Sequence, residues 1–253
     1  MKQKIVAMVP ARSGSQGLPD KNIQLLNGLP LIAHSILPAI DCPDISATYI
    51  NSDSQKYLDI GRSYGARPYM RPQELGDHEA SMQPVIADFV SALQTMGESV
   101  DAVLVLFPTY PFRTAKHLID LIKLYENSEG CKSVAGFKAP DTHPYLCANL
   151  AEDGIVSSYI DFDRNRYYRR QDYPDCVEFT GWAFVLDVRH IDELNAYLLA
   201  PESKGFRIPE DATVLDVDTI RDFRYAEFLV EKGYVKAYGG TAFGTHPRVV
   251  KTG

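Results

Sequence analysis

Two stretches of the sequence carry residue types and spacings that suit phosphate and metal chemistry. The first is VPARSGSQGLPDKN, residues 9–22, at the end of the apolar run IVAMV. It contains two cations, Arg12 and Lys21, and two glycines, Gly14 and Gly17. Glycine lets backbone N–H groups approach a phosphate closely, and the cations supply charge for a triphosphate. The alternative is an ordinary loop between a strand and a helix.

Two common phosphate-binding patterns are absent from this loop. The dinucleotide fingerprint GxGxxG needs a second glycine where Gln16 stands. The P-loop pattern GxxxxGK[ST] needs a lysine after its second glycine, but Leu18 follows Gly17. Both spacings fail, which disfavours a dinucleotide-dependent reductase and a P-loop nucleotide hydrolase.

The second stretch is LDVDT, residues 215–219, with Asp216 and Asp218 one residue apart. On an extended strand such residues point to the same face. Paired carboxylates could therefore converge on Mg²⁺, a hard cation that prefers oxygen ligands. The alternative is a solvated pair before a helix, with Asp218 or Thr219 as its cap.

Apolar runs alternate with helical segments, and these elements must position the two stretches. This alternation predicts parallel strands with crossover helices, hence a doubly wound α/β sheet. We expect strands at 4–10, 45–53, 66–70, 101–108, 132–138, 179–187 and 214–218, and helices at 29–40, 54–65, 81–97, 114–130, 188–199 and 219–233.

The alternation lapses between about residues 140 and 175, where Pro, Asp, Arg and Tyr are frequent. A hairpin is expected near EDGIVSSYI, residues 152–160. A long irregular insertion in a compact domain is usually functional or an interaction arm. We therefore expect one domain over residues 1–232 with this insertion, followed by a glycine-rich tail, 233–253, of unknown role.

Bulk composition limits the classes of function. The 253 residues are 45% hydrophobic, enough for a full core. A net charge of −7 without a basic run argues against a nucleic-acid partner. The four cysteines form no CxxC pair, as expected for reduced thiols in a cytoplasmic protein. No apolar run reaches membrane-spanning length, so no membrane partner is expected.

Five segments together resemble one enzyme family. PARSGSQGLPDKNI, followed by LNGLPLIAHSI, resembles the opening of the cytidylyltransferases that make CMP-activated acidic sugars, the CMP-N-acylneuraminate (CMP-sialic acid) synthetases. The other segments fall in the family's order: NSDS (51–54), RPQELGDHEAS (71–81), LFPTYPFR (106–113) and LDVDT (215–219). The resemblance covers roughly residues 4–232.

The resemblance implies a Rossmann-like α/β fold with an inserted dimerisation arm, here about 140–175, in a homodimer. It implies transfer of CMP from CTP to the anomeric hydroxyl of a nonulosonic acid such as N-acetylneuraminate, with release of pyrophosphate and dependence on Mg²⁺. Such a transfer depends chiefly on positioning and charge neutralisation.

The resemblance also assigns roles to individual residues. The catalytic residues are Arg12, Lys21, Asp216 and Asp218, and the two aspartates hold the metal. The substrate-binding residues are Ser13, Gly14, Ser15 and Gly17 around the phosphates, Asn22, Arg71 and Ser81 at the nucleoside, and Tyr110, Arg169 and Arg170 at the sugar. Arg71 has an alternative role as a structural ion-pair partner of Glu74.

The sugar-binding half departs from the family pattern. Phe107 and Tyr110 replace the usual Gln and Ser, and Leu146 stands where a Lys is common. Glu178 and Trp182 lie in EFTGWAFVLD, where RPNGAIYI is usual. No histidine is clearly placed to accept the proton, although His78 and His143 are candidates. The alternatives are a different sugar or sugar 1-phosphate with another nucleotide, and a catalytically silent nucleotide-binding regulator.

Overall fold

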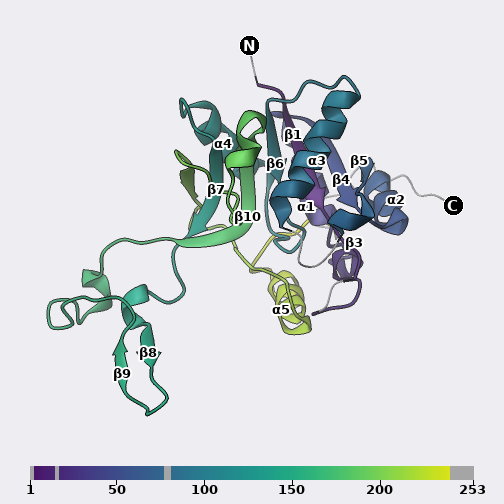
Figure 1. Cartoon of the computed structure of the whole chain (residues 1–253). Coiled ribbons are helices and arrows are strands. Elements are labelled where there is room, and N and C mark those ends of the chain that lie inside the picture. Colours follow the sequence, from purple (N-terminus) through teal and green to yellow (C-terminus); the bar gives the residue numbers. More distant parts are fainter. Residues whose placement is uncertain (1–2, 15–16, 77–80, 240–253) are drawn as a thin grey trace.

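The centre of this computed structural model, which describes residues 3–14, 17–76 and 81–239, is a mixed seven-stranded sheet (Figure 1). Neighbouring strands pair in parallel except β10, which is antiparallel to β6 and β7. The predicted, mostly parallel α/β sheet is confirmed. The strand order is β11 (Lys204–Arg207), β7 (Ser133–Lys138), β10 (Glu178–Asp187), β6 (Ala102–Val105), β1 (Ile5–Pro10), β4 (Ile45–Ser52) and β5 (Arg67–Met70).

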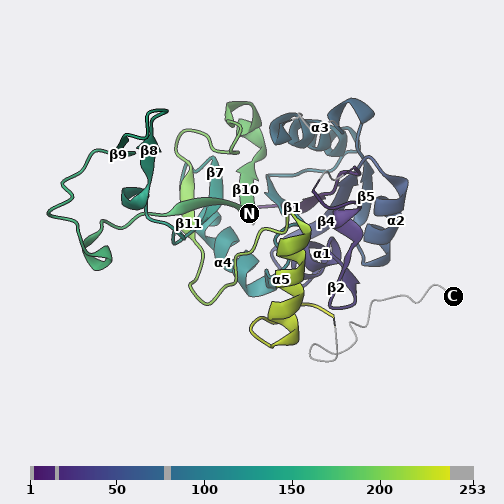
Figure 2. The same cartoon turned by 90° about the horizontal axis from the view of Figure 1, so that it is seen from below.

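Helices cover both faces of the sheet (Figure 2). Alternate residues of β1 pack on opposite faces: Ile5 and Val9 join the cluster with α1, α2 and α4, whereas Val6 and Met8 join the cluster with α3. Burial on both faces explains the unbroken apolar run of this strand. The helices are α1 (Ala33–Ile40), α2 (Gln55–Ser63), α3 (Met82–Thr95), α4 (Ala115–Glu126) and α5 (Ile220–Glu231).

The reversed direction of β10 follows from the insertion that precedes it. Lys138 ends β7 and pairs with Glu178, the first residue of β10. Residues 139–177 leave the end of β7 and return to the neighbouring position at the start of β10, so β10 must run back along β7. This segment projects away from the sheet in both views (Figures 1 and 2), and we call it the arm.

The arm has a small structure of its own. It contains the hairpin of β8 (Ala148–Leu150) and β9 (Val156–Ser158), which confirms the predicted hairpin, and two 3₁₀ helices, Pro144–Leu146 and Arg170–Asp172. The rings of Tyr145 and Phe162 stack with their centroids 3.8 Å apart. Aromatic contacts therefore order a segment that lies outside the main core.

Helix α5 follows the aspartate segment in the chain and packs against the opening loop. Its N-terminus is closed by a capping box, in which the Thr219 hydroxyl accepts from the Asp222 N–H and Asp222 accepts from the Thr219 N–H. Thr219 is therefore the cap. Phe223 of this helix packs in one cluster with Leu18 of the opening loop and Val217, so residues 17–18 and 215–218 are held together.

The predictions differ from the structure at two strands, one at the aspartate pair and one at the edge of the sheet. Residues 214–218 are not a strand: the Val217 N–H donates to the Thr109 carbonyl at 2.8 Å, without a ladder around it. The edge strand β11 was not predicted, because an exposed edge strand reading KGFR has no continuous apolar run.

The helix predicted at 188–199 is only a 3₁₀ helix, Val188–Glu193. The Asn195 side chain accepts the N–H groups of Tyr197 and Leu199 at 2.9 and 3.1 Å. A side chain that bonds the following backbone competes with the helical pattern, which explains why the chain turns here.

The helix predicted at 29–40 begins late, at Ala33, and Pro30 lies in a strand instead of a first helical turn. Residues 25–30 form a hairpin of β2 (Leu25–Leu26) and β3 (Leu29–Pro30). Its turn, Asn27-Gly28, has φ of 53° and 80°, the conformation that favours Asn-Gly in two-residue hairpins. Shorter 3₁₀ helices lie at Lys21–Ile23 and Gln73–Leu75. None of the helices within the described residues is long and apolar enough to cross a membrane.

Candidate active site

A cavity of about 380 Å³ lies where β1 and β6 end. Its walls include Pro10, the last residue of β1, and Phe107 and Thr109, which follow β6. Open α/β sheets bind ligands at the carboxyl ends of their strands. Six of the residues predicted to hold nucleotide or metal line this cavity: Arg12, Gly17, Lys21, Asn22, Arg71 and Asp218.

Lys21 and Asp218 form the closest charged pair of the cavity. The Lys21 ammonium lies 2.6 Å from Asp218 Oδ1, and the lysine side chain is only 12% exposed. Gly17 fits beside them because a Cβ there would lie 2.6 Å from the Asp218 carbonyl oxygen. The opening loop and the aspartate segment are thus in backbone contact, and Gly17 is required for that approach.

Asp53 holds the first part of the opening loop, a role that the sequence analysis did not assign to it. Its two carboxylate oxygens accept the Ser13 N–H at 2.7 Å and the Ser13 hydroxyl at 2.8 Å. The Ser13 hydroxyl proton is therefore directed at Asp53 and not into the cavity. Gly14 follows with φ of 73°, a left-handed conformation that glycine adopts readily.

Arg71 is buried at the wall of the cavity, with 5% of its surface exposed. Its Nε donates to Asn51 Oδ1 at 2.7 Å and its Nη2 donates to the Asn51 carbonyl at 3.3 Å. Burial lowers the pKa of Arg71, and the charge of Arg12 adds to this, while Asp53 opposes it. Because Asn51 is fully buried on β4, it holds the Arg71 guanidinium in a fixed orientation.

Asn22 and Ser81, the residues predicted to contact the nucleoside, lie in different settings. The Asn22 amide donates to the Arg12 carbonyl at 3.1 Å, and its side chain is 5% exposed. Ser81 is the N-cap residue of α3 and is exposed. Its neighbour Met82 lines the cavity, so α3 begins at the cavity rim.

Asp216 is bonded to the loop that follows β6. Its Oδ2 accepts the Tyr110 hydroxyl at 2.8 Å, and its carboxylate also accepts from Thr109. Desolvation raises the pKa of Asp216 and the charge of Asp218 adds to the rise, while the hydrogen bonds from Thr109 and Tyr110 oppose it. The two aspartates therefore lie close enough to interact.

The donor set around these aspartates fits Mg²⁺. Both candidate ligands are carboxylates with hard oxygen atoms, and the Lys21 ammonium pairs with Asp218, so a positive charge is accommodated beside this carboxylate. No cluster of three His, Cys, Asp or Glu side chains with metal-site geometry occurs among the residues described. Mg²⁺ characteristically takes one or two carboxylates and completes its shell with phosphates and water, which this pair allows.

Arg169 and Arg170 lie in the arm, and a single chain does not bring them to the cavity. Arg169 donates from Nε to Asp172 at 2.7 Å, and Arg170 begins a 3₁₀ helix. His143 caps another such helix, accepts the Tyr145 N–H and contacts the Pro174 carbonyl, which gives it a structural role.

Glu178, which departs from the family pattern, is matched by a cation. Its Oε1 lies 3.5 Å from Lys138 Nζ. Ser15, His78 and the tail from 240 to 253 lie outside the described residues.

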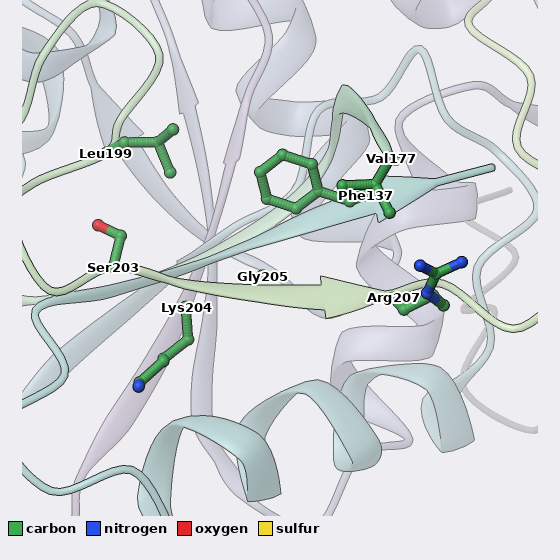
Figure 3. A pocket seen from close by; sticks show the side chains of 7 residues that line it. All are labelled: Phe137, Val177, Leu199, Ser203, Lys204, Gly205 and Arg207. Carbon is green, nitrogen blue, oxygen red and sulfur yellow. The ribbon is translucent and has the colours of Figure 1, made fainter. Parts of the chain in front are cut away.

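A second cavity, of about 340 Å³, lies at the β11 edge (Figure 3). Phe137, Val177 and Leu199 form its apolar wall, and Arg207 stands at its end. Arg207 is paired with Asp175. Lys204 is a second cation of this lining, but no carboxylate of the described residues lines the cavity, so it lacks the metal ligand that Asp218 offers at the first cavity.

The geometry can be compared with known proteins. Residues 6–130 match the model of a family described as cytidylyltransferase. The matched segment contains the opening loop and Arg71, and it is similar to that family. The chain is 29% identical to an N-acylneuraminate cytidylyltransferase of Escherichia coli over 92% of this chain and 53% of that protein, so it spans about half the length of that relative. It is 28% identical to a CMP-N,N'-diacetyllegionaminic acid synthase of Legionella pneumophila, over 90% of this chain and 97% of that protein.

A further cytidylyltransferase relative acts on another acidic sugar by its name. It is a pseudaminic acid cytidylyltransferase of Campylobacter jejuni, 28% identical over 93% of this chain and all of that protein. Among solved structures, a CMP:2-keto-3-deoxy-manno-octonic acid synthetase complexed with CTP superposes with a TM-score of 0.66 at 15% identity. The match covers 91% of this chain and 100% of that one. This likeness supports the Rossmann-like fold.

Proposed function

We propose that this cytidylyltransferase transfers CMP from CTP to the anomeric hydroxyl of a nonulosonic acid and releases pyrophosphate. The observation that carries the proposal is the convergence of Arg12, Lys21, Arg71 and Asp218 on one cavity at the carboxyl ends of β1 and β6. The names of the relatives support both the nucleotide and the class of acceptor.

The residues of the cavity divide between binding and charge neutralisation. Arg12 and Lys21 offset the triphosphate charge, and Gly14 and Gly17 let backbone N–H groups approach it. The fixed Arg71 guanidinium and the Asn22 amide suit the polar edge of cytosine, because planar donors can make paired hydrogen bonds. Asp53 keeps the loop in shape through Ser13.

Asp216 and Asp218 would hold Mg²⁺, which supplies charge stabilisation to the transferring phosphoryl group when it is bound. We expect bound substrate to draw the Lys21 ammonium away from Asp218 Oδ1, where it lies at 2.6 Å. Lys21 is then free to contact a phosphate oxygen. The site thus exchanges an internal ion pair for a set of contacts with substrate.

The acceptor class follows from the relatives and from the residues near the end of β6. The relatives act by name on sialic, legionaminic and pseudaminic acids. Where this chain departs from the sialate pattern, Phe107 packs edge-to-face on Phe184 with ring centroids 6.0 Å apart. An aromatic wall suits an acceptor with more apolar substituents than N-acetylneuraminate.

We also propose a homodimer in which the arm of one subunit reaches the site of its partner. The arm carries exposed apolar side chains, including Leu150 at 74% and Val156 at 64% exposure, and a second copy would cover them. Such a contact would bring Arg169 and Arg170 to the acceptor carboxylate. Because CTP is an intracellular nucleotide, the reaction belongs in the cytoplasm, and its product suits surface glycan synthesis.

Pyrophosphate release tests the function. Purified protein with Mg²⁺ is assayed against four nucleoside triphosphates, each with N-acetylneuraminate, other nonulosonic acids and hexosamine 1-phosphates. The proposal predicts release only with CTP and a nonulosonic acid. Release with another triphosphate, or with a sugar 1-phosphate, would contradict it.

A further inference from the structure

The middle of β10 departs from regular pairing beside the active site. Phe179 pairs with Phe137 and Phe184 pairs with Ala135, so residues 180–183 lie opposite the single residue Gly136. Bulges of this kind remove backbone groups from the ladder and redirect them, frequently next to active sites. Here the redirected groups include the Gly181 N–H and the Trp182 carbonyl.

Side chains of the loop that follows β6 bind both of these backbone groups. The Gly181 N–H donates to the Tyr110 hydroxyl oxygen at 3.1 Å, and the Trp182 carbonyl accepts from Arg113 Nη1. Arg113 is 1% exposed and also donates to the Phe107 carbonyl at 2.6 Å. The bulge and the loop are therefore fastened at two points.

The hydrogen-bond directions around Tyr110 are determined by its partners. The Gly181 N–H can only donate, so the phenolic oxygen accepts there. An ionised carboxylate can only accept, so the phenolic proton goes to Asp216 Oδ2 at 2.8 Å. The hydroxyl therefore both donates and accepts a hydrogen bond within the protein, and Tyr110 is 8% exposed.

We propose that Tyr110 is a positioning residue, which holds the Asp216 carboxylate for the metal, and that the β10 bulge exists in this chain to fix Tyr110. This rests on the proposed function only in taking Asp216 as a metal ligand. It replaces the expectation that Tyr110 contacts the sugar, because its hydroxyl is already bonded on both sides.

The packing at Gly181 is consistent with this role. A Cβ at this position would lie 3.1 Å from Tyr110 Cε2 and 3.4 Å from its hydroxyl oxygen. Glycine therefore lets the tyrosine ring lie against β10 at the distance that its hydrogen bond to residue 181 needs. The Tyr110 ring in the loop therefore fits against β10 because Gly181 has no side chain.

The first test is Tyr110→Phe, which removes the hydroxyl and keeps the ring. Mn²⁺ binding in the presence of CTP is measured by electron paramagnetic resonance, with no acceptor present and hence no turnover. Outer-shell partners of metal ligands typically contribute 10–100-fold to metal affinity, and we expect the Mn²⁺ affinity to fall within that range. CTP affinity at saturating metal should change by less than about threefold, since Tyr110 does not contact the nucleotide in this account.

Two controls separate positioning from general damage. Tyr238→Phe removes a hydroxyl that donates to another carboxylate, Asp41, at 3.1 Å, and should leave Mn²⁺ binding unchanged. Gly181→Ala leaves every hydroxyl in place but crowds the Tyr110 ring, and should weaken Mn²⁺ binding in the same direction as Tyr110→Phe. Thermal unfolding of each variant shows whether the fold persists.

The outcomes distinguish this inference from the proposed function. Wild-type Mn²⁺ affinity in both Tyr110→Phe and Gly181→Ala would overturn the positioning role. Wild-type Mn²⁺ affinity in Asp216→Asn would overturn it as well, by removing Asp216 from the metal. If Tyr110→Phe weakens Mn²⁺ binding but no acceptor supports pyrophosphate release, the positioning role stands and the proposed reaction is wrong.

Discussion

Arg12 and Lys21 reach the candidate nucleotide site from one loop but lie in different settings. Lys21 is paired with Asp218 at 2.6 Å, whereas the side chain of Arg12 lines the cavity and its charge is felt by Arg71. A bound triphosphate would offer anionic oxygens to these cations.

Replacing Arg12 tests this at the residue scale. Arg12→Ala should lower kcat by about 10²–10³-fold, the range for removing one preorganised donor to developing charge. Initial rates over a range of CTP concentrations give kcat and KM separately. Arg224→Ala is the control, since Arg224 is an exposed residue of α5 paired with Glu227. A raised KM with unchanged kcat would make Arg12 a binding residue only.

Much of the site could be predicted from residue types, and its supports could not. Arg12, Lys21 and Asp218 belong to motifs at the ends of elements that a parallel sheet brings to one edge. The role of Asp53 was not predicted, because its partner, Ser13, lies 40 positions away. Tyr110 was assigned to the sugar because only the structure gives its two hydrogen bonds.

At the scale of elements, α1 is joined to the β2–β3 hairpin through a buried histidine. His34 is fully buried, and its Nε2 lies 2.9 Å from the Leu26 carbonyl. Burial lowers the pKa of His34 to about 4, although hydrogen bonds to the Leu26 and Leu29 backbone oppose this shift. Protonation in the folded state is therefore unfavourable near neutral pH.

The sign of the pH effect follows from that pKa. Between about pH 6.5 and pH 4 the unfolded chain binds a proton at His34 that the folded chain does not. Stability therefore falls as pH decreases through this window, by up to about 1.4 kcal/mol per pH unit from this group. Above pH 6.5 the group has no such effect.

Urea unfolding at pH 7 and pH 5 tests this prediction in the wild type and in His34→Asn. The wild type should lose more free energy of unfolding between the two pH values than the variant loses. His190→Asn serves as the control, because His190 is partly exposed and contacts the exposed acid Glu193. Equal losses in the wild type and His34→Asn would contradict the account.

Elements with one strong local signal were predicted well, and those set by tertiary contacts were not. The run in β1 is apolar throughout because both faces are buried, and its strand was predicted. The Asn27-Gly28 turn carried a hairpin signal that the neighbouring apolar residues obscured. Residues 214–218 look like a strand, but their Val217 N–H is bound by the Thr109 carbonyl instead of a ladder.

At the scale of the whole molecule, the role that we propose for the arm depends on a second copy. It leaves and re-enters the sheet between Lys138 and Glu178, so its removal need not disturb the strands. Its apolar side chains are exposed, and Arg169 and Arg170 do not line the cavity of their own chain. We infer that it completes the acceptor site of a partner subunit.

Leu150→Asp on β8 tests this inference, because it places a charge on a side chain that is 74% exposed. We expect the variant to be monomeric by analytical ultracentrifugation and to lose acceptor-dependent turnover while keeping CTP affinity. Met96→Asp, an equally apolar and exposed position after α3 (65%), should remain dimeric and active. A monomeric wild type, or a fully active Leu150→Asp monomer, would contradict the proposed arrangement.

The central claim is that this chain joins CMP to a nonulosonic acid. Its most direct test is mass spectrometry of the product after incubation with CTP, Mg²⁺ and a mixture of isotopically labelled sialic, legionaminic and pseudaminic acids. The account predicts one or more species that contain both CMP and a labelled sugar, absent when CTP is replaced by UTP. Free CMP without a sugar conjugate, or a conjugate formed from UTP, would contradict it.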